Sequence, residues 1–299
     1  MAVLGLGLAA LGRPGYLTLG HGADLDFERS RSAMELRCRQ VCDAAWDGGL
    51  RWFDAARSYG LAEQFLASWL TDRQIPGPSA SVSSKWGYTY TAGWRVDADP
   101  PEVKDHSTAA LRRQWPETKA LLGPWLVLYQ VHSATLESGI LDDKNAHRAL
   151  VELGVPVGVT LSGPRQAETL RRALEIMVDG EPVWSAVQAT WNLLEPSVGP
   201  ALAEAKAAGW TVIVKEALAN GRLAAEAPPE LGAKPDTVAI AAALLQPWAD
   251  VVLSGAVTVD QVRSNLAAAE LTHLDLDRFT HLAVDPDTYW RDRAALPWT

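Results

Sequence analysis

Short apolar runs alternate with longer amphipathic segments along almost the whole chain, and this alternation constrains the fold more than any other feature. Buried parallel strands read as continuous apolar runs, whereas helices carry apolar residues on one face. The apolar runs are Val3–Leu6, Leu50–Asp54, Ser81–Lys85, Trp125–His132, Pro156–Leu161, Val183–Gln188, Trp210–Lys215 and Asp250–Leu253. The segments between and after them predict helices at Ser32–Asp47, Leu61–Leu70, Pro101–Leu122, Asp142–Leu153, Gln166–Met177, Pro200–Ala208, Asp236–Gln246 and Val259–Ala269.

Eight strand-then-helix units in 299 residues predict one domain, residues 1–299, with the α/β architecture of a (β/α)8 TIM barrel. The main alternative is a doubly wound open sheet, whose first turn carries a glycine-rich dinucleotide fingerprint. Gly5 and Gly7 match its first two glycines, but the third is out of register and Gly12–Gly15 is typical of a loop. The barrel is therefore the preferred prediction. Its catalytic-face loops are expected at Gly12–Glu28, Trp86–Pro100 and Ala224–Lys234.

Charge and composition exclude several classes of partner. The formal net charge is −9, whereas a nucleic-acid partner requires a basic face. No stretch is long and apolar enough to span a bilayer, and Met1–Leu17 lacks the basic start and cleavage site of a secretory signal. Cys38 and Cys42 share a helix face, where i,i+4 spacing fits a disulfide poorly. We therefore expect a cytoplasmic protein with reduced thiols and no metal site.

Polar residues close three successive apolar runs. Asp54 ends the second run, Lys85 the third and His132 the fourth, and Tyr59 follows shortly after Asp54. In a barrel the carboxyl ends of the strands meet at one face, where barrel enzymes carry their catalytic groups. Taken singly, each of these residues is more typical of a cap, an ion pair or a packed side chain. Together, at the ends of consecutive strands, the four predict a catalytic site.

These four residue types suit the reduction of a carbonyl group. The reaction needs a proton donor for the developing alkoxide, and tyrosine, with a pKa of about 10, is too weak an acid alone. A nearby ammonium lowers that pKa, so we expect Lys85 to tune Tyr59 while Asp54 holds Lys85 charged and in place. A neutral His132 can donate a hydrogen bond to the carbonyl oxygen and orient the substrate.

Three segments resemble the aldo-keto reductase family: Phe53–Gly60 with Glu63, Ser84–Gly87, and Gln130–His132. The resemblance extends from about Leu4 to Leu266, nearly the whole chain. It implies a (β/α)8 barrel that binds NADPH in an extended form at the C-terminal face. It also implies that Tyr59 is the general acid. Lys85 and Asp54 would tune this acid, and His132 would orient the substrate.

The same resemblance places the nicotinamide end of the cofactor against three strand ends. Thr160 stands in a segment where the family often has Gly-Val-Ser-Asn, and it can bond the carboxamide, whereas Leu161 cannot. Gln188 matches the second amide-binding position. Lys215 stands where many relatives have an aromatic ring that stacks on the nicotinamide. Glu216 replaces a serine near the pyrophosphate, which a glutamate would repel.

The remaining cofactor candidates follow the last two strands. Leu218 comes after the seventh run, and Ser254 and Gly255 come after the eighth. Asn265 matches the adenine-contacting position. Gly255 and Gln261 stand where many relatives carry the Lys and Arg that grip the 2′-phosphate. The predicted cofactor is therefore NADPH, with NADH as the alternative.

Aromatic residues on the same face are candidates for the substrate pocket. Trp86 follows Lys85 directly, Trp191 follows the sixth run, and His21 lies in the first long loop. Aromatic walls suit apolar or ring-containing carbonyl compounds. Ordinary loop packing explains each of these residues equally well when it is taken alone.

The preferred function is an NAD(P)H-dependent reductase that converts a small aldehyde or ketone to an alcohol, reversibly. One alternative is a non-catalytic nicotinamide-binding or redox-sensing barrel subunit, which the incomplete cofactor pattern invites. Another is a redox-neutral enzyme on the same scaffold, which the unusual Lys215–Glu216 pair invites. The sequence leaves the substrate, the physiological direction and the oligomeric state open.

Overall fold

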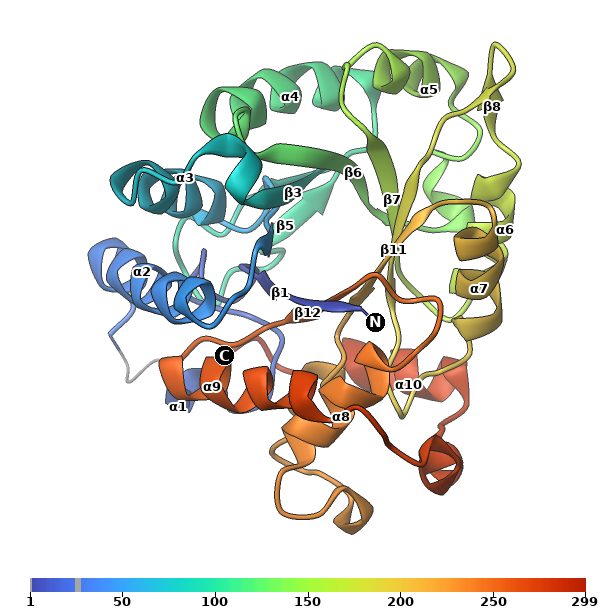
Figure 1. The fold of residues 1–299 in the computed structure, drawn as a ribbon. Coiled ribbons are helices and arrows are strands. Elements are labelled where there is room, and N and C mark those ends of the chain that lie inside the picture. Colours follow the sequence, from blue (N-terminus) through green and yellow to red (C-terminus); the bar gives the residue numbers. More distant parts are fainter. Residues whose placement is uncertain (1, 25–27) are drawn as a thin grey trace.

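Eight parallel strands close into a barrel in the computed structural model, which describes residues 2–24 and 28–299 (Figure 1). Neighbouring barrel strands follow one another in the chain, and β1 closes the ring between β12 and β2. The strands are β1 (Val3–Gly7), β2 (Trp52–Asp54), β3 (Ser81–Trp86), β6 (Leu126–Ala134), β7 (Val157–Leu161), β10 (Ala186–Thr190), β11 (Thr211–Lys215) and β12 (Val251–Ser254). The predicted (β/α)8 fold is confirmed, and every predicted strand is present with its ends shifted by a few residues.

An outer ring of helices surrounds the strands (Figure 1). The ring consists of α2 (Arg31–Asp47), α3 (Ala62–Asp72), α4 (Thr108–Leu122), α5 (Lys144–Val151), α6 (Gln166–Leu174), α7 (Gly199–Ala207), α8 (Pro235–Leu244) and α9 (Val259–Leu266). Two further helices are α1 (His21–Asp24) and α10 (Pro286–Ala294). Short 3-10 helices lie at Gly77–Ser79, Leu136–Ser138, Ala219–Gly221, Pro229–Leu231, Ala267–Glu270 and Leu276–Leu282. None of the helices in the described residues has the length and apolar character needed to cross a membrane.

The predicted helix Pro101–Leu122 is wrong in its first turns. Helix α4 begins only after Ser107, whose Oγ accepts a hydrogen bond from the Ala110 backbone N over 3.1 Å and caps the helix. The residues before this cap form β5 (Glu102–Lys104), which pairs antiparallel with β4 (Tyr88–Tyr90). A hairpin therefore occupies part of the region that was predicted as a loop and a helix start.

Other predicted loops and helix ends also contain short elements. Met177, predicted to end a helix, lies instead in β8 (Met177–Val178), which pairs with β9 (Glu181–Pro182). The predicted loop Gly12–Glu28 contains α1, and its residues 25–27 lie outside the described part of the chain. Cys38 and Cys42 are buried free thiols whose Sγ atoms lie 4.0 Å apart. The prediction of reduced cysteines on one helix face is confirmed.

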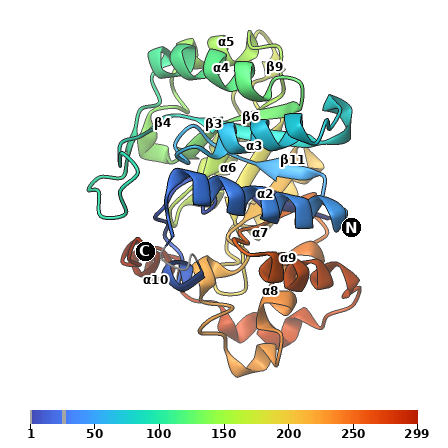
Figure 2. The ribbon, with the colours of Figure 1, turned by 90° about the vertical axis from the view of Figure 1, so that its left-hand side faces the viewer.

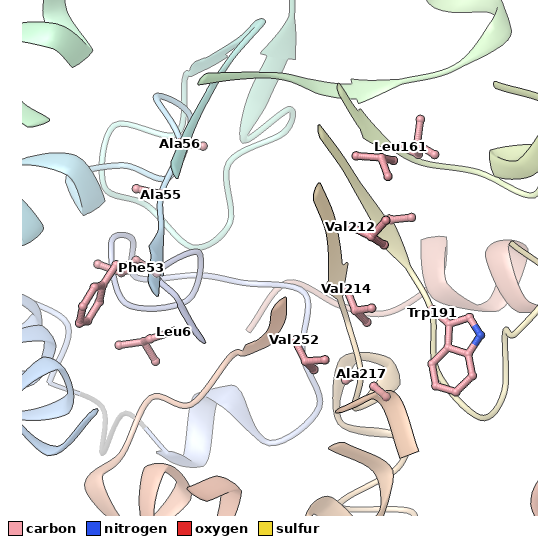
Figure 3. Packing of buried hydrophobic residues seen from close by; sticks show 14 of the residues in the cluster. Leu6, Phe53, Ala55, Ala56, Leu161, Trp191, Val212, Val214, Ala217 and Val252 are labelled. Carbon is pink, nitrogen blue, oxygen red and sulfur yellow. The ribbon is translucent and has the colours of Figure 1, made fainter. Parts of the chain in front are cut away.

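Alternation along the strands separates two apolar layers, because successive side chains of a strand point to opposite faces. Figure 3 shows part of the larger outer cluster, which includes Phe53, Val212 and Val214. A second, smaller cluster consists of Leu128, Ala186, Ile213, Val251 and Leu253, with Trp52 packed against it. The same alternation puts Asp54 on the side of Trp52 and Lys215 on the side of Ile213. Polar groups at these strand ends thus continue the interior layer.

The C-terminal segment closes the catalytic face of the barrel. Figure 2 shows α10, α1 and the C-terminus on the same side as β4, with the N-terminus at the opposite end. The tail is fixed by two backbone hydrogen bonds of 3.2 Å each, in which Tyr16 N donates to Thr299 O and Thr299 N donates to Tyr16 O. At the start of α10, Asp285 accepts a hydrogen bond from Thr288 N over 3.1 Å. The N-terminal loop and the C-terminal tail therefore pack together over the site.

Candidate active site

A buried ion pair forms the floor of the site. Lys85, at the end of β3, is almost fully buried and contacts Asp54, which ends the neighbouring strand β2. Asp54 Oδ1 also accepts hydrogen bonds from Ser83 Oγ at 2.7 Å and from Gln188 Nε2 at 3.1 Å. Lys85 Nζ donates a further hydrogen bond to the Ala55 carbonyl at 3.0 Å. Both charges are therefore compensated, as a buried pair requires, and the predicted contact between Asp54 and Lys85 is confirmed.

Tyr59 lies above this pair. Its ring centroid is 4.9 Å from Lys85 Nζ, and its hydroxyl is 3.4 Å from Nε2 of His132. Burial raises the pKa of Tyr59 well above its usual value, and the negative charge of Asp54 raises it further. The expected lowering of the Tyr59 pKa by Lys85 stays a prediction; in this arrangement the ammonium is paired with Asp54 and does not outweigh burial. Tyr59 is thus held in its protonated form.

His132 faces the same point from the end region of β6. Its Nδ1 lies 3.3 Å from Ser58 Oγ, and its ring packs edge-on against Tyr59 with a centroid distance of 5.3 Å. Burial lowers the pKa of His132 well below its usual value, and the positive charge of Lys85 adds to this. The imidazole is therefore neutral, in agreement with the expectation from the sequence. His106 Nε2, which the sequence analysis did not single out, donates a 2.7 Å hydrogen bond to the His132 carbonyl.

A cavity of about 630 Å³ runs from these residues across the carboxyl ends of the strands. This volume is within the usual range for small-molecule sites, about 300–1,000 Å³. Its wall contains three of the four predicted catalytic residues and all of the predicted cofactor residues: Asp54, Tyr59, His132, Thr160, Gln188, Lys215, Leu218, Ser254, Gly255, Gln261 and Asn265. The fourth, Lys85, lies behind the wall as the partner of Asp54. The structure thus gathers residues from all eight barrel units around one space.

Two of the strand-end residues form hydrogen bonds at or next to the predicted catalytic residues. Thr160, at the end of β7, accepts a hydrogen bond from Ser133 N over 2.7 Å through its hydroxyl oxygen. Gln188 of β10 donates to Asp54, as described above. Leu161 belongs to the outer apolar cluster and is fully buried. Its inability to bind an amide therefore follows from its position on the other face of the strand, not from a lost contact.

The charge of Glu216 is neutralised by a residue far away in the sequence. Arg293, on α10, binds both carboxylate oxygens of Glu216, with Nε at 2.9 Å from Oε2. Thr190 Oγ1 donates a further hydrogen bond of 3.1 Å. Burial alone would raise the pKa of Glu216, but Arg293 and then Lys215 outweigh it and lower the pKa to about 2. The expected repulsion between Glu216 and a pyrophosphate is therefore reduced, because the carboxylate is already paired.

Lys215 is the less compensated cation of this group. Its Nζ lies 4.0 Å from Glu216 Oε1, a longer contact than the one between Arg293 and Glu216. Burial lowers the pKa of Lys215 to about 8, although Glu216 opposes this shift. Near neutral pH the amine is mainly protonated and available to an anionic group in the cavity.

The β12–α9 segment forms a further part of the cavity wall. Ser254 Oγ donates to Asn265 Oδ1 over 2.6 Å and accepts from Ala256 N over 3.1 Å. Gln261 Oε1 accepts from Val257 N over 2.8 Å. A Cβ on Gly255 would meet no atom within 4 Å, so this position is open to the cavity. The four predicted residues of this segment, Ser254, Gly255, Gln261 and Asn265, thus form one continuous surface.

Two of the three predicted substrate residues, Trp86 and Trp191, do not lie in the cavity wall. Trp86 is fully buried and packs edge-on against His106, with ring centroids 6.1 Å apart. Trp191 is also buried, and its ring packs against Trp248 at 5.7 Å. Both indoles belong to the core, because large apolar rings gain most from complete burial. The predicted substrate contact of the His21 side chain lies outside what the structure describes.

Among the cavity residues that the sequence analysis missed, four come from segments that meet only in space: Arg13, Tyr88, Glu102 and Trp298. Arg13 lies in the first loop and is buried, with its guanidinium 5.2 Å from the Tyr59 ring centroid and 4.6 Å from that of Trp298. It forms a 2.8 Å ion pair with Glu102 of β5. Tyr88 of β4 packs against His132 at 5.0 Å. The only available signal was Arg13 itself, a charged residue inside an otherwise apolar segment.

The fold and the site define a barrel protein whose tyrosine, histidine and lysine–aspartate pair meet at the carboxyl ends of the strands. The chain belongs to the aldo/keto reductase family, because the model of this family matches residues 4–231. A comparison with curated protein sequences finds no match.

Solved structures agree with this assignment at the level of the fold. The holo form of aldo-keto reductase AKR11C1 from Bacillus halodurans is 21% identical, covers 94% of this chain and 92% of its own, and has a TM-score of 0.67. A Pseudomonas aeruginosa protein described as an aldo-keto reductase is 22% identical, covers 90% of each chain and has a TM-score of 0.64.

Proposed function

We propose that this protein reduces an aldehyde or ketone to an alcohol with a nicotinamide dinucleotide, with Tyr59 as the general acid. One observation carries the proposal. The Tyr59 hydroxyl and Nε2 of His132 lie 3.4 Å apart in the wall of one cavity, and both groups are held neutral by burial. A carbonyl oxygen between them would accept hydrogen bonds from both, because a neutral imidazole and a phenol each carry one donor.

The residues present fit a nicotinamide dinucleotide. Near Tyr59 the cavity wall offers Thr160 and Gln188, whose side chains can bind a carboxamide. The wall continues past Lys215, the nearest cation suited to a phosphate, to Asn265. When bound, the dinucleotide supplies the hydride that attacks the carbonyl carbon.

The protein's own residues handle the proton. As negative charge develops on the substrate oxygen, Tyr59 donates its proton to that oxygen, and His132 stabilises the charge by a hydrogen bond. The raised pKa of Tyr59 keeps this proton in place until the alkoxide forms. The buried Asp54–Lys85 pair supports the Tyr59 ring from below and places a cation near the phenolate that is left behind. In the oxidative direction the same residues act in reverse order.

A redox-neutral reaction finds less support, because it would need a basic group in the cavity, and near neutral pH the amine of Lys215 is mainly protonated. Glu216 is paired with Arg293, and its pKa is lowered to about 2. Tyr59 carries its proton, and burial lowers the pKa of His132, so neither side chain is an effective base near neutral pH. The buried free thiols favour a cytoplasmic location, which we include in the proposal.

Two measurements test the proposal. Titration with NADH and NADPH, followed by intrinsic fluorescence of the 13 tryptophans, should show binding. Consumption of the bound reduced cofactor should then depend on an added aldehyde or ketone. Tyr59→Phe should lower turnover by about 10²–10⁴-fold and leave cofactor affinity nearly unchanged.

Tyr90→Phe is the matched control, because Tyr90 lies on β4 but not in the cavity wall. It should keep wild-type turnover. Failure to bind either dinucleotide, or wild-type turnover in Tyr59→Phe, would refute the proposed function.

A further inference from the structure

Two carboxylates lie in the part of the cavity wall that contains the β12–α9 segment, here called the far end. This far end consists of Ser254, Gly255, Gln261 and Asn265, together with Asp24 of α1 and Asp236 of α8. The family resemblance, in which Asn265 matches the adenine-contacting position, implies that a dinucleotide with its nicotinamide beside Tyr59 extends its adenosine toward this part of the wall. The inference that follows therefore rests on the proposed function.

Both carboxylates are fixed by amides of the far end. Gln261 Nε2 donates to Asp24 Oδ2 over 2.9 Å, and Asn265 Nδ2 donates to Asp236 Oδ2 over 3.2 Å. The amides are themselves anchored, because Gln261 accepts from Val257 N and Asn265 accepts from Ser254 Oγ. Among the described side chains, each carboxylate accepts a hydrogen bond only through Oδ2. Within the described residues Oδ1 of each has no side-chain donor, and both aspartates belong to the cavity wall.

No positive side chain belongs to the far end among the described residues of its wall. Arg37 donates to the backbone carbonyl of Asp24 at 2.9 Å from outside the wall. Arg263 of α9 is largely exposed and pairs with Asp260 at 3.2 Å. A ligand group at the far end therefore meets two negative charges without a compensating cation from the wall.

We propose that Asp24 and Asp236 select NADH over NADPH by accepting hydrogen bonds from the adenosine ribose. A ribose 2′-hydroxyl can donate to a carboxylate, the arrangement by which dinucleotide sites recognise NAD. A 2′-phosphate has no proton to donate at neutral pH and carries its own negative charge beside these two. The structure thus favours the cofactor that the sequence analysis treated as the alternative.

Fluorescence titration measures this preference without a substrate. The wild-type protein should bind NADH more tightly than NADPH by about tenfold or more, since two charges at short range oppose the phosphate. Asp24→Asn and Asp236→Asn should each improve NADPH binding and so reduce the ratio of the NADPH to the NADH dissociation constant. The double variant should reduce this ratio most. Asp260→Asn is the matched control, because it removes a charge from α9 at a 92% exposed side chain outside the wall. The ratio of the two dissociation constants in Asp260→Asn should stay close to that of the wild-type protein.

The outcomes separate this inference from the proposed function. Equal or tighter binding of NADPH by the wild-type protein would overturn the selection but leave the reductase proposal standing. Equal changes of both affinities in the Asp24 and Asp236 variants would show that the carboxylates do not read the ribose, and would also overturn it. Binding of neither dinucleotide would refute both proposals together. Circular dichroism of each variant confirms that the fold is retained.

Discussion

Replacement of Arg293 by methionine should destabilise the protein strongly, although Arg293 lies outside the eight barrel units. The guanidinium binds both oxygens of Glu216, whose side chain is only 9% exposed. Arg293→Met keeps the aliphatic stem and removes the charge. Glu216 would then be left buried, with Lys215 at 4.0 Å and Thr190 as its remaining partners.

The size of the effect follows from the pKa of Glu216. In the folded protein it is lowered from 4.5 to about 2, and each tenfold change in proton affinity corresponds to about 1.4 kcal/mol, so the environment favours the carboxylate by about 3 kcal/mol. Breaking a buried ion pair typically costs about 3–5 kcal/mol. Arg293→Met should therefore lower the free energy of unfolding by about 3 kcal/mol at neutral pH.

The contribution of Glu216 to the free energy of unfolding depends on pH. Because the folded pKa is lowered, the stabilisation by Glu216 is fully present above its unfolded value of 4.5 and is lost as the pH falls toward 2. The difference between the wild type and Arg293→Met should therefore be largest near neutral pH. It should shrink below the unfolded pKa.

Equilibrium urea unfolding measures these free energies. Arg291→Met is the matched control, because Arg291 lies on the same helix, is 70% exposed and, among the residues that the structure describes, pairs only with Asp292. It should change stability by less than about 0.5 kcal/mol. The double variant Glu216→Gln/Arg293→Met should recover part of the loss, because no buried charge remains. Equal stability of the Arg293→Met and Arg291→Met proteins would refute the reasoning.

The remaining predictions concern protonation in the active site. Because burial and Lys85 keep His132 neutral, the pH profile of kcat/KM should show no acidic limb near 6.5, the usual histidine pKa; a limb there would contradict the neutral imidazole. Lys215 loses its proton around pH 8, so dinucleotide affinity should weaken above that pH in the wild type and be lower but flat in Lys215→Gln; parallel profiles would exclude a phosphate contact. Lys85→Met leaves the Asp54 carboxylate buried without its cation, and the unfolding free energy should fall by about 3–5 kcal/mol. A loss below about 1 kcal/mol in the same urea assay would show that Asp54 is compensated by its hydrogen bonds alone.

Local pattern was sufficient for the barrel and for the floor of its active site. Continuous apolar runs identify buried parallel strands, and eight of them leave few alternative folds. A strand end fixes where a side chain emerges, so the positions of Asp54, Lys85 and His132 in the sequence were enough to assign all three to one face. The family resemblance assigned Thr160 and Gln188 to the cofactor site, and the structure has both in the cavity wall.

Residues that depend on packing between distant segments were not predictable in this way. Trp86 and Trp191 follow strands, as catalytic-face residues do, yet both pack in the core. The hairpin of β4 and β5 was missed, because strands of three residues have too little periodicity to be distinguished from a loop or a helix start. Whether a side chain lines a cavity depends on which neighbours compete for it.

The sequence by itself determined the barrel, its catalytic face and the residue types that carry the chemistry, because these follow from short-range periodicity. Only the tertiary structure decided the charges of the site. It paired Glu216 with Arg293, placed Arg13 beside Tyr59, and brought Asp24 and Asp236 to the far end of the cavity. These contacts join residues far apart in the chain, and electrostatic energies depend on distance and burial in space, which local sequence does not contain.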